Sequence, residues 1–259
     1  MIKSLMRNAV LFLFVLFFAN RLSAQEDSVV RAPDNDRIRY ETLDSSSPYY
    51  YPSLYYRYCE GDTTLTLEDY RHLYYGFVWQ PEYKPFETPL AHDKILMILE
   101  SDSLGEADFQ EIIRLGKEAM EREPFSPSLV NYLVYAYGSI GDTLNERINY
   151  YRLEGILDAI RSSGTGLSEK SPWHIIYFSH VNDFLASANI RCKKEQIISR
   201  SVAYLPVLVK QKGVKGYYFD FSRIYMKRPE KEPEKRSTGW EFNGIPLKKR
   251  VAPTVIKTE

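Results

Sequence analysis

Apolar and polar positions follow two different periods along the chain, and the change of period divides the sequence. From residue 62 to residue 162, apolar residues recur every three or four positions, which is the spacing of amphipathic helices. After the glycine-rich stretch at 164–166 the spacing shortens towards two, and β-branched and aromatic residues become frequent, as they are in strands. Helices over 62–162 followed by strands over 173–226 predict an α+β fold whose C-terminal sheet is antiparallel and has about four strands.

Capping and turn residues set the limits of the predicted elements. Thr66 and Asp69 match a capping box, in which the threonine hydroxyl accepts a backbone N–H and the acid reaches back, so a helix is expected from Thr66 to about Trp79. Proline favours the first turn of a helix and glycine favours its end, and these residues mark further helix limits. The remaining helices are predicted over 108–123, 127–140 and 142–162, and the strands over 173–178, 181–186, 197–208 and 216–226.

The two helices on either side of Gly141 form a predicted hairpin that resembles a tetratricopeptide repeat. The large, small, aromatic and glycine residues that carry the resemblance are Leu133, Ala136, Tyr137 and Gly141. Glu146 and Leu153 depart from the pattern, because the repeat has small residues at those positions. The resemblance covers roughly 55 residues, fewer than two repeats, so it implies a single hairpin layer and not a solenoid.

The N-terminal residues have the pattern of a targeting segment. Lys3 and Arg7 precede an apolar run over 9–19, and small residues precede a cleavage point after Ala24, which is the pattern of a secretory signal peptide over 1–24. The apolar run is shorter than the roughly 20 residues that span a membrane, so we expect export to the periplasm or the extracellular space and no transmembrane segment after cleavage.

Two polar segments flank the predicted domain. Residues 25–48 are expected to be a flexible lead-in, because they contain too few apolar residues for a core. Residues 227–259 begin with a stretch of charges and prolines and are expected to be a charged, disordered tail. The sequence therefore predicts one α+β domain over 49–226.

Composition and cysteine content exclude several classes of protein. The chain has 34 basic and 34 acidic residues, and this lack of a basic surplus argues against a nucleic-acid partner. Cys59 and Cys192 form a disulfide or remain two unrelated thiols; both alternatives are open in an oxidising compartment. None of the four histidines lies four positions from another, so we expect no metal site, and no motif indicates a cofactor.

One helix carries a group of polar and aromatic residues that is a candidate binding site. Glu68 and His72 lie four positions apart, so the carboxylate can orient the imidazole as in a general-base pair. The alternative is a polar helix face that satisfies buried partners, and the aromatic rings also suit a partner peptide or a sugar. The candidate binding residues are Glu68, Arg71, His72, Tyr75, Trp79 and Tyr83, and no catalytic residue is assigned.

Part of this region also resembles a known family. The stretches at 61–76 and 80–83, with a weaker match at 218–220, resemble an uncharacterised domain-of-unknown-function family of exported bacterial proteins. The resemblance extends over about residues 50–226 and implies export and a fold, but no activity.

We therefore expect an exported, non-enzymatic interaction or scaffold module of the bacterial envelope, which binds a protein partner or a glycan. The hairpin groove and the tyrosine-rich segment are its candidate surfaces. The alternatives are a hydrolase or glycan-processing enzyme that uses Glu68 and His72, and a glycan-binding module. The exposure of the aromatic residues over 66–83 distinguishes these hypotheses, because exposed rings favour recognition and buried rings favour a structural role.

Overall fold

The structure is a computed structural model, and it describes residues 30–87, 90–101, 103–211 and 213–226, with short pieces at 241–242 and 245–246. The chain forms two compact units, the first ending at Lys227 and the second running from Arg228 to Glu259. In the second unit, β5 (Glu241–Phe242) and β6 (Ile245–Pro246) form a short antiparallel ladder. The predicted signal peptide and the rest of the predicted tail lie outside the described residues.

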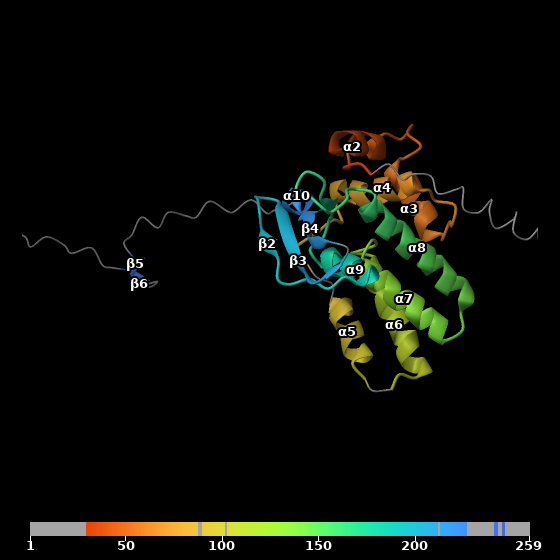
Figure 1. The fold of residues 1–259 in the computed structure, drawn as a ribbon. Helices are drawn as coiled ribbons and strands as arrows, with labels where there is room; N and C mark the ends of the chain where they lie inside the picture. Colours follow the sequence, from red (N-terminus) through yellow and green to blue (C-terminus); the bar gives the residue numbers. More distant parts are fainter. Residues whose placement is uncertain are drawn as a thin grey trace, which may run out of the picture. The chain divides into compact units, whose positions relative to one another are not determined.

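The first unit begins with helices and ends with a small sheet (Figure 1), which confirms the predicted α+β class. Its helical elements are α2 (Asn35–Leu43), α3 (Tyr51–Cys59), α4 (Leu67–Gly76), η1 (Phe77–Trp79), α5 (Leu90–Leu99), α6 (Glu106–Met120), α7 (Pro127–Ser139), α8 (Thr143–Arg161), α9 (Ser179–Ser187) and α10 (Ser222–Tyr225). Its strands are β1 (Trp173–His174), β2 (Gln196–Ile197), β3 (Val202–Gln211) and β4 (Val214–Asp220).

Helices α5 to α8 pack against one another in chain order, and α7 and α8 form the predicted hairpin (Figure 1). Gly141 connects them with a φ of 77°, a left-handed conformation that glycine adopts without steric cost. Gly138 makes room for Glu146, because a Cβ at Gly138 would lie 2.9 Å from the Glu146 carboxylate. The large residue that departs from the repeat pattern is thus accommodated by a missing side chain on the facing helix.

The sheet is mixed and not purely antiparallel, which corrects the prediction. Its strand order is β1-β4-β3-β2, and β1 pairs with β4 in parallel, with His174 opposite Asp220. The predicted strand over 181–186 is wrong as well, because these residues belong to helix α9. Val181, Phe184 and Leu185 are buried there at helical spacing, and this spacing outweighs their strand propensity.

The described part of the lead-in predicted over 25–48 differs from the prediction of a flexible segment, because it contains helix α2. Asp34 caps this helix by accepting a hydrogen bond from the Arg37 amide at 3.0 Å. Ile38 and Thr42 are buried, and α2 packs on α4, where a Cβ at Gly76 would lie 2.7 Å from the Thr42 methyl group. Only these two residues of the polar helix are buried, so its sequence has no apolar stripe from which a helix could be predicted.

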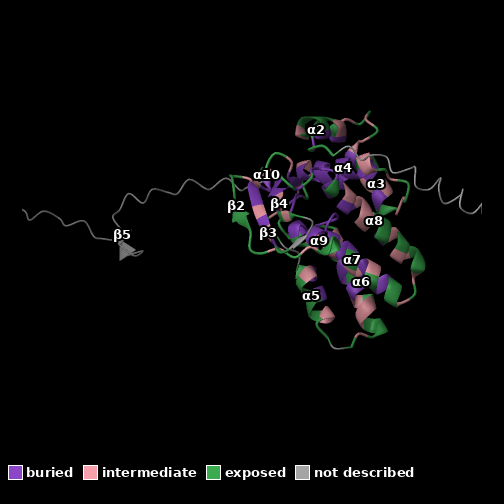
Figure 2. Cartoon of the chain, in the orientation of Figure 1, coloured by how far each residue is buried: buried purple, intermediate pink, exposed green. Residues whose placement is uncertain are grey.

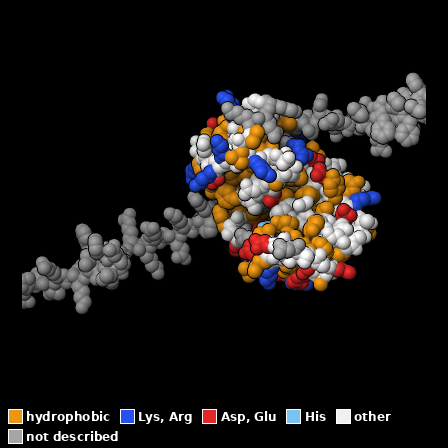
Figure 3. Space-filling model, turned by 60° about the horizontal axis from the view of Figure 1, so that its bottom comes forward, with side chains coloured by type: hydrophobic (Ala, Val, Ile, Leu, Met, Phe, Trp, Pro, Cys, Tyr) orange, Lys and Arg blue, Asp and Glu red, His pale blue; other side chains and the backbone are white. Residues whose placement is uncertain are grey.

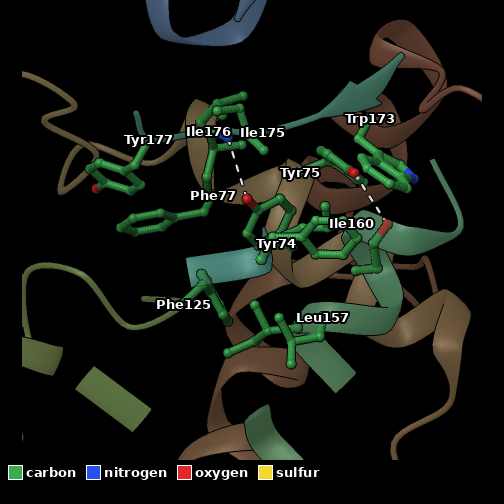
Figure 4. Packing of buried hydrophobic residues seen from close by; sticks show 14 of the residues in the cluster. Tyr74, Tyr75, Phe77, Phe125, Leu157, Ile160, Trp173, Ile175, Ile176 and Tyr177 are labelled. Carbon is green, nitrogen blue, oxygen red and sulfur yellow. Dashed lines mark hydrogen bonds between the residues drawn. The ribbon is translucent and has the colours of Figure 1, made fainter. Parts of the chain in front are cut away.

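Figure 2 colours the buried residues of the core, and tyrosine and phenylalanine form much of it (Figure 4). The fully buried Phe125 lies among the rings of Tyr55, Tyr58, Tyr74 and Phe77, at centroid distances of 5.2 to 6.5 Å. Several of the buried hydroxyls donate to backbone carbonyls; Tyr58, for example, donates to Pro124 at 2.7 Å. The tyrosine-rich segment therefore supplies packing area and also satisfies carbonyls of the loops around it.

The capping box of α4 allows a first prediction. The Thr66 hydroxyl accepts from the Asp69 amide at 3.2 Å, and the Asp69 carboxylate accepts from the Thr66 amide at 2.8 Å. Thr66→Ala is expected to lower the free energy of unfolding by about 1 kcal/mol, as measured by urea denaturation. Thr143→Ala, at an exposed first-turn position of α8, serves as the control and should change it little. Equal effects of the two substitutions would argue against the cap.

Candidate functional site

His72 of the candidate cluster is buried and has a partner at each ring nitrogen. Its Nδ1 lies 2.8 Å from the backbone oxygen of Glu68, and its Nε2 lies 2.7 Å from Oε2 of Glu41 on α2. The ring of Tyr49 stacks on the imidazole at a centroid distance of 3.8 Å. Both nitrogens of the imidazole therefore have a polar partner, and one face of the ring is covered by Tyr49.

The partners of His72 also limit what its ring can do chemically. Burial acts to raise the pKa of Glu41, but hydrogen bonds from Arg37 and His72 hold that pKa below its ordinary value, so Glu41 is ionised. A backbone oxygen and a carboxylate only accept hydrogen bonds, so both ring nitrogens of His72 face acceptor groups of the protein. A general base must reach a proton of the substrate, and both ring nitrogens of the buried His72 are already engaged within the protein.

The other candidate residues are mostly buried structural groups. Arg71 donates to the Ser162 hydroxyl at 2.8 Å and to the backbone oxygen of Arg31 at 3.1 Å. The Tyr75 hydroxyl donates to the backbone oxygens of Ala159 and His174, and its ring is fully enclosed (Figure 4). These bonds connect α4 to α8 and to β1.

The structure brings only part of the predicted cluster together. Glu68 lies 3.7 Å from both Arg71 and His72, so these three residues form one group. Trp79 packs instead under the guanidinium of Arg39, at 4.9 Å, and Tyr83 donates to the backbone oxygen of Ile176 at 2.5 Å. The buried rings favour a structural role for this segment.

A second polar group, which the sequence analysis missed, forms around Arg223. This side chain is only 1% exposed, and it lies 4.9 Å from the Tyr75 ring centroid. Its guanidinium lies 3.0 Å from His174 Nδ1, and because arginine only donates, that nitrogen accepts the hydrogen bond. Parallel pairing of β1 with β4 places Asp220 beside the same imidazole, at 3.4 Å.

The electrostatics of this group are those of a buried polar network, in which Arg223 Nε has no hydrogen-bond partner among the described residues. Burial acts to raise the pKa of Asp220, but the neighbouring His174 and hydrogen bonds from Ser222 lower it to about 2. Burial lowers the pKa of His174, which agrees with a neutral ring that accepts from Arg223. Arg223 also donates to the backbone oxygen of Pro33 and to the side chain of Asn35, so it attaches the N-terminal segment to the end of the domain.

A groove of about 390 Å³ runs between α3, α6, α7 and α8; we name it the hairpin groove. Its lining includes Tyr55, Tyr58, Cys59, Lys117, Met120, Ile148 and Arg152. Arg152 donates to the backbone oxygens at the end of α3, and Lys117 lies 5.9 Å from the Tyr137 ring centroid. The groove therefore offers aromatic and thioether surface between two cations that are held in place.

Both cysteines are free thiols in the structure, so the disulfide alternative does not describe it. Cys59 is exposed at the end of α3, whereas Cys192 is half-buried beside β3. Within the part of the chain that the structure describes, no group of three or more His, Cys, Asp or Glu residues is arranged to hold a metal ion. The expectation that the protein needs no cofactor stays a prediction.

The fold and these clusters define an α+β domain whose polar core groups are engaged in structural contacts. Residues 36–229 match the family model described as Domain of unknown function (DUF4919), and the chain belongs to this family. The match confirms the predicted membership of an uncharacterised family, and it starts inside α2, so it includes most of that helix. No curated protein and no solved structure matches the chain. Among the described helices, none has both the length and the apolar character needed to cross a membrane.

Proposed function

We propose that the protein is an exported, non-enzymatic interaction module of the bacterial envelope, which holds a segment of a partner protein in the hairpin groove. The pattern of basic, apolar and small residues over 1–24 supports export. The hairpin of α7 and α8, which resembles a tetratricopeptide repeat, forms one side of the groove.

The observation that carries this proposal is the contrast between the groove and the candidate cluster. Tyr75 and Tyr83 are buried and hydrogen-bonded, so they offer no surface to a partner. In the hairpin groove, Met120 and Ile148 are only partly buried, and methionine adapts its shape to irregular partners.

The charges of the groove limit the kind of partner. Lys117 and Arg152 are balanced by Glu60 and Glu121, so the lining has no net charge. A segment with an apolar or aromatic anchor and few charges suits this surface better than an acidic or basic peptide.

The two alternatives have less support. The hydrolase alternative assigns the role of base to His72, and both nitrogens of that residue are engaged. The glycan-binding alternative needs exposed rings over 66–83, where Tyr70, Tyr74, Tyr75 and Tyr83 are buried. No specific observation favours either activity.

The exposed thiol of Cys59 allows a direct test. A thiol-reactive photocrosslinker attached at Cys59 is expected to capture one partner in envelope preparations, and the purified partner is expected to bind the unmodified protein. The same reagent on Cys192 of the Cys59→Ser variant is the control, since Cys192 does not line the groove. Equal capture from both positions would contradict the proposal.

A pair of substitutions on α8 tests the groove itself. Ile148→Glu places a carboxylate in the groove and is expected to abolish binding of the purified partner. Leu144→Glu lies on the same helix at an exposed position outside the groove and is expected to leave binding unchanged. Circular dichroism checks that both variants fold. Undiminished binding by folded Ile148→Glu would remove the groove from the proposal.

Cell fractionation and N-terminal sequencing test the export. The expected result is a protein in the periplasm or the medium whose first residue is Gln25. Recovery of a chain in the cytosol that still begins with Met1 would contradict this part of the proposal.

A further inference from the structure

A second pocket, of about 460 Å³, lies between the start of α5, the end of α6 and the segment after η1; we name it the acidic pocket. Five of its lining residues are glutamates and two are basic, which leaves an excess of three negative charges. Figure 3 views the molecule from the end at which α5 and α6 lie, and Asp and Glu side chains gather there. None of these glutamates belongs to the candidate cluster around His72.

The two basic residues of the pocket share one partner. The Glu87 carboxylate lies 3.6 Å from Lys84 and 3.3 Å from Arg122. Glu118 pairs with Arg114, at 3.1 Å, which lies outside the pocket. Three glutamates then remain without a cationic partner among the described residues: Glu82, Glu121 and Glu123.

Glu123 is the unusual member of this set, because it is only 8% exposed. Its carboxylate has no hydrogen bond and no ion pair in the part of the chain that the structure describes. Burial, with a smaller contribution from the charge of Asp183 on α9, raises the pKa of Glu123 to about 7. An unpartnered buried carboxylate lowers stability, and a cation that enters the pocket removes this cost.

We propose that the acidic pocket binds an aliphatic primary amine, with one ammonium group at the Glu123 carboxylate. Glu82 and Glu121 lie at exposed positions of the same pocket, so they are available to a second ammonium group of a diamine. Leu90 and Ala91 at the start of α5 supply apolar contact for the carbon chain. This site shares Glu121 with the hairpin groove, but it does not depend on the function proposed for the groove.

An organic cation fits this pocket better than a metal ion. Divalent cations need several oxygen ligands that converge on one point. In the described part of the chain, no three His, Cys, Asp or Glu residues converge in this way. Carboxylates that are distributed around a pocket match charges that are separated along a flexible chain.

Isothermal titration calorimetry of the purified full chain tests the proposal with 1,5-diaminopentane as the probe. Binding is expected at neutral pH, and 1,5-pentanediol, which has the same carbon chain without charge, is expected not to bind. Glu123→Gln is expected to weaken diamine binding by about tenfold or more, because it removes the buried partner of an ammonium group. Diol binding equal to that of the diamine would overturn the proposal, as would the absence of diamine binding.

Two controls separate a built site from general attraction to an acidic surface. Glu106→Gln removes an exposed charge from the first turn of α6, outside the pocket, and is expected to leave the affinity unchanged. If it weakens binding as much as Glu123→Gln does, the amine is held by surface charge alone and the proposal fails. Tighter binding of calcium or magnesium chloride, in competition with the diamine, would also overturn it.

The source of the amine is decided by a third probe. A short peptide with one central lysine carries the same ammonium group on the same kind of carbon chain. If the peptide binds more tightly than the diamine and depends on Glu123, the ligand is a lysine side chain of a partner protein. If the diamine binds more tightly, the ligand is a free amine; both results support the site.

Discussion

Phe125→Ala is expected to lower the free energy of unfolding by about 3–5 kcal/mol, the usual cost of removing a fully buried aromatic ring. The ring lies 5.2 Å from Tyr58 and 5.5 Å from Phe77, centroid to centroid, so it joins α3 to the end of α4. The surrounding tyrosines are held by their own hydroxyl contacts and cannot all move into the cavity. Guanidinium chloride denaturation of both proteins measures the difference.

Two further variants make this result specific. Phe86→Ala removes the same ring from a half-exposed position and should cost less than about 1 kcal/mol. Phe125→Leu retains most of the volume and is expected to fall between the two. If Phe125→Ala and Phe86→Ala cost the same, the aromatic cluster is not the centre of the core.

The second large effect is a loss of stability in acid that originates at His180. This residue is fully buried, its Nδ1 lies 2.7 Å from the Tyr74 hydroxyl, and burial lowers its pKa to about 3. The unfolded chain takes up a proton at this side chain below about pH 6.5, whereas the folded chain does not. The free energy of unfolding is therefore expected to fall by roughly 4 kcal/mol between pH 6.5 and pH 3, at about 1.36 kcal/mol per unit of pKa difference.

Comparison with a variant isolates this contribution from other titrating groups. His180→Leu cannot titrate, so its stability relative to the original protein should improve steadily as the pH falls from 6.5. Val181→Ala, at a buried position of the same helix without a titratable group, is the control and should show no such trend. The isolation is needed because Glu123 acts in the opposite direction. Because the pKa of Glu123 is raised to about 7, the free energy of unfolding gains from this residue as the pH falls from about 7 towards the pKa of an ordinary glutamate. A constant difference between His180→Leu and the original protein would contradict the assignment.

The helix limits were predictable because their signals are local. Thr66 with Asp69, Pro127 and Gly141 each fix a helix start or end through contacts within one turn, and the structure confirms these limits. The parallel pairing of β1 with β4 was not predictable, because it joins residues more than 40 positions apart and no periodicity encodes it. Helix α9 was misread because its buried residues are also good strand formers.

In the candidate site too, contacts within one helix were predictable and contacts from distant segments were not. Spacing of three and four residues correctly placed Glu68 beside Arg71 and His72. It could not show that Glu41 and Tyr49 enclose the imidazole, because both precede the helix by many residues. Glu123 has the sequence environment of an ordinary surface charge, Glu-Arg-Glu-Pro, and Asp183, whose charge helps to raise its pKa, lies 60 positions later in the chain.

The attachment of the N-terminal segment has a consequence for the order of folding. The Arg223 side chain binds the backbone oxygen of Pro33, 190 positions earlier in the chain. Ribosomes make the chain from its N-terminus, so Pro33 exists long before the residue that holds it. The stretch before α2 is thus released from the ribosome without its anchor, and it reaches its final place only when almost the whole domain has been synthesised. Truncation just before Arg223 should therefore leave this stretch accessible to proteases even where the preceding helices have formed.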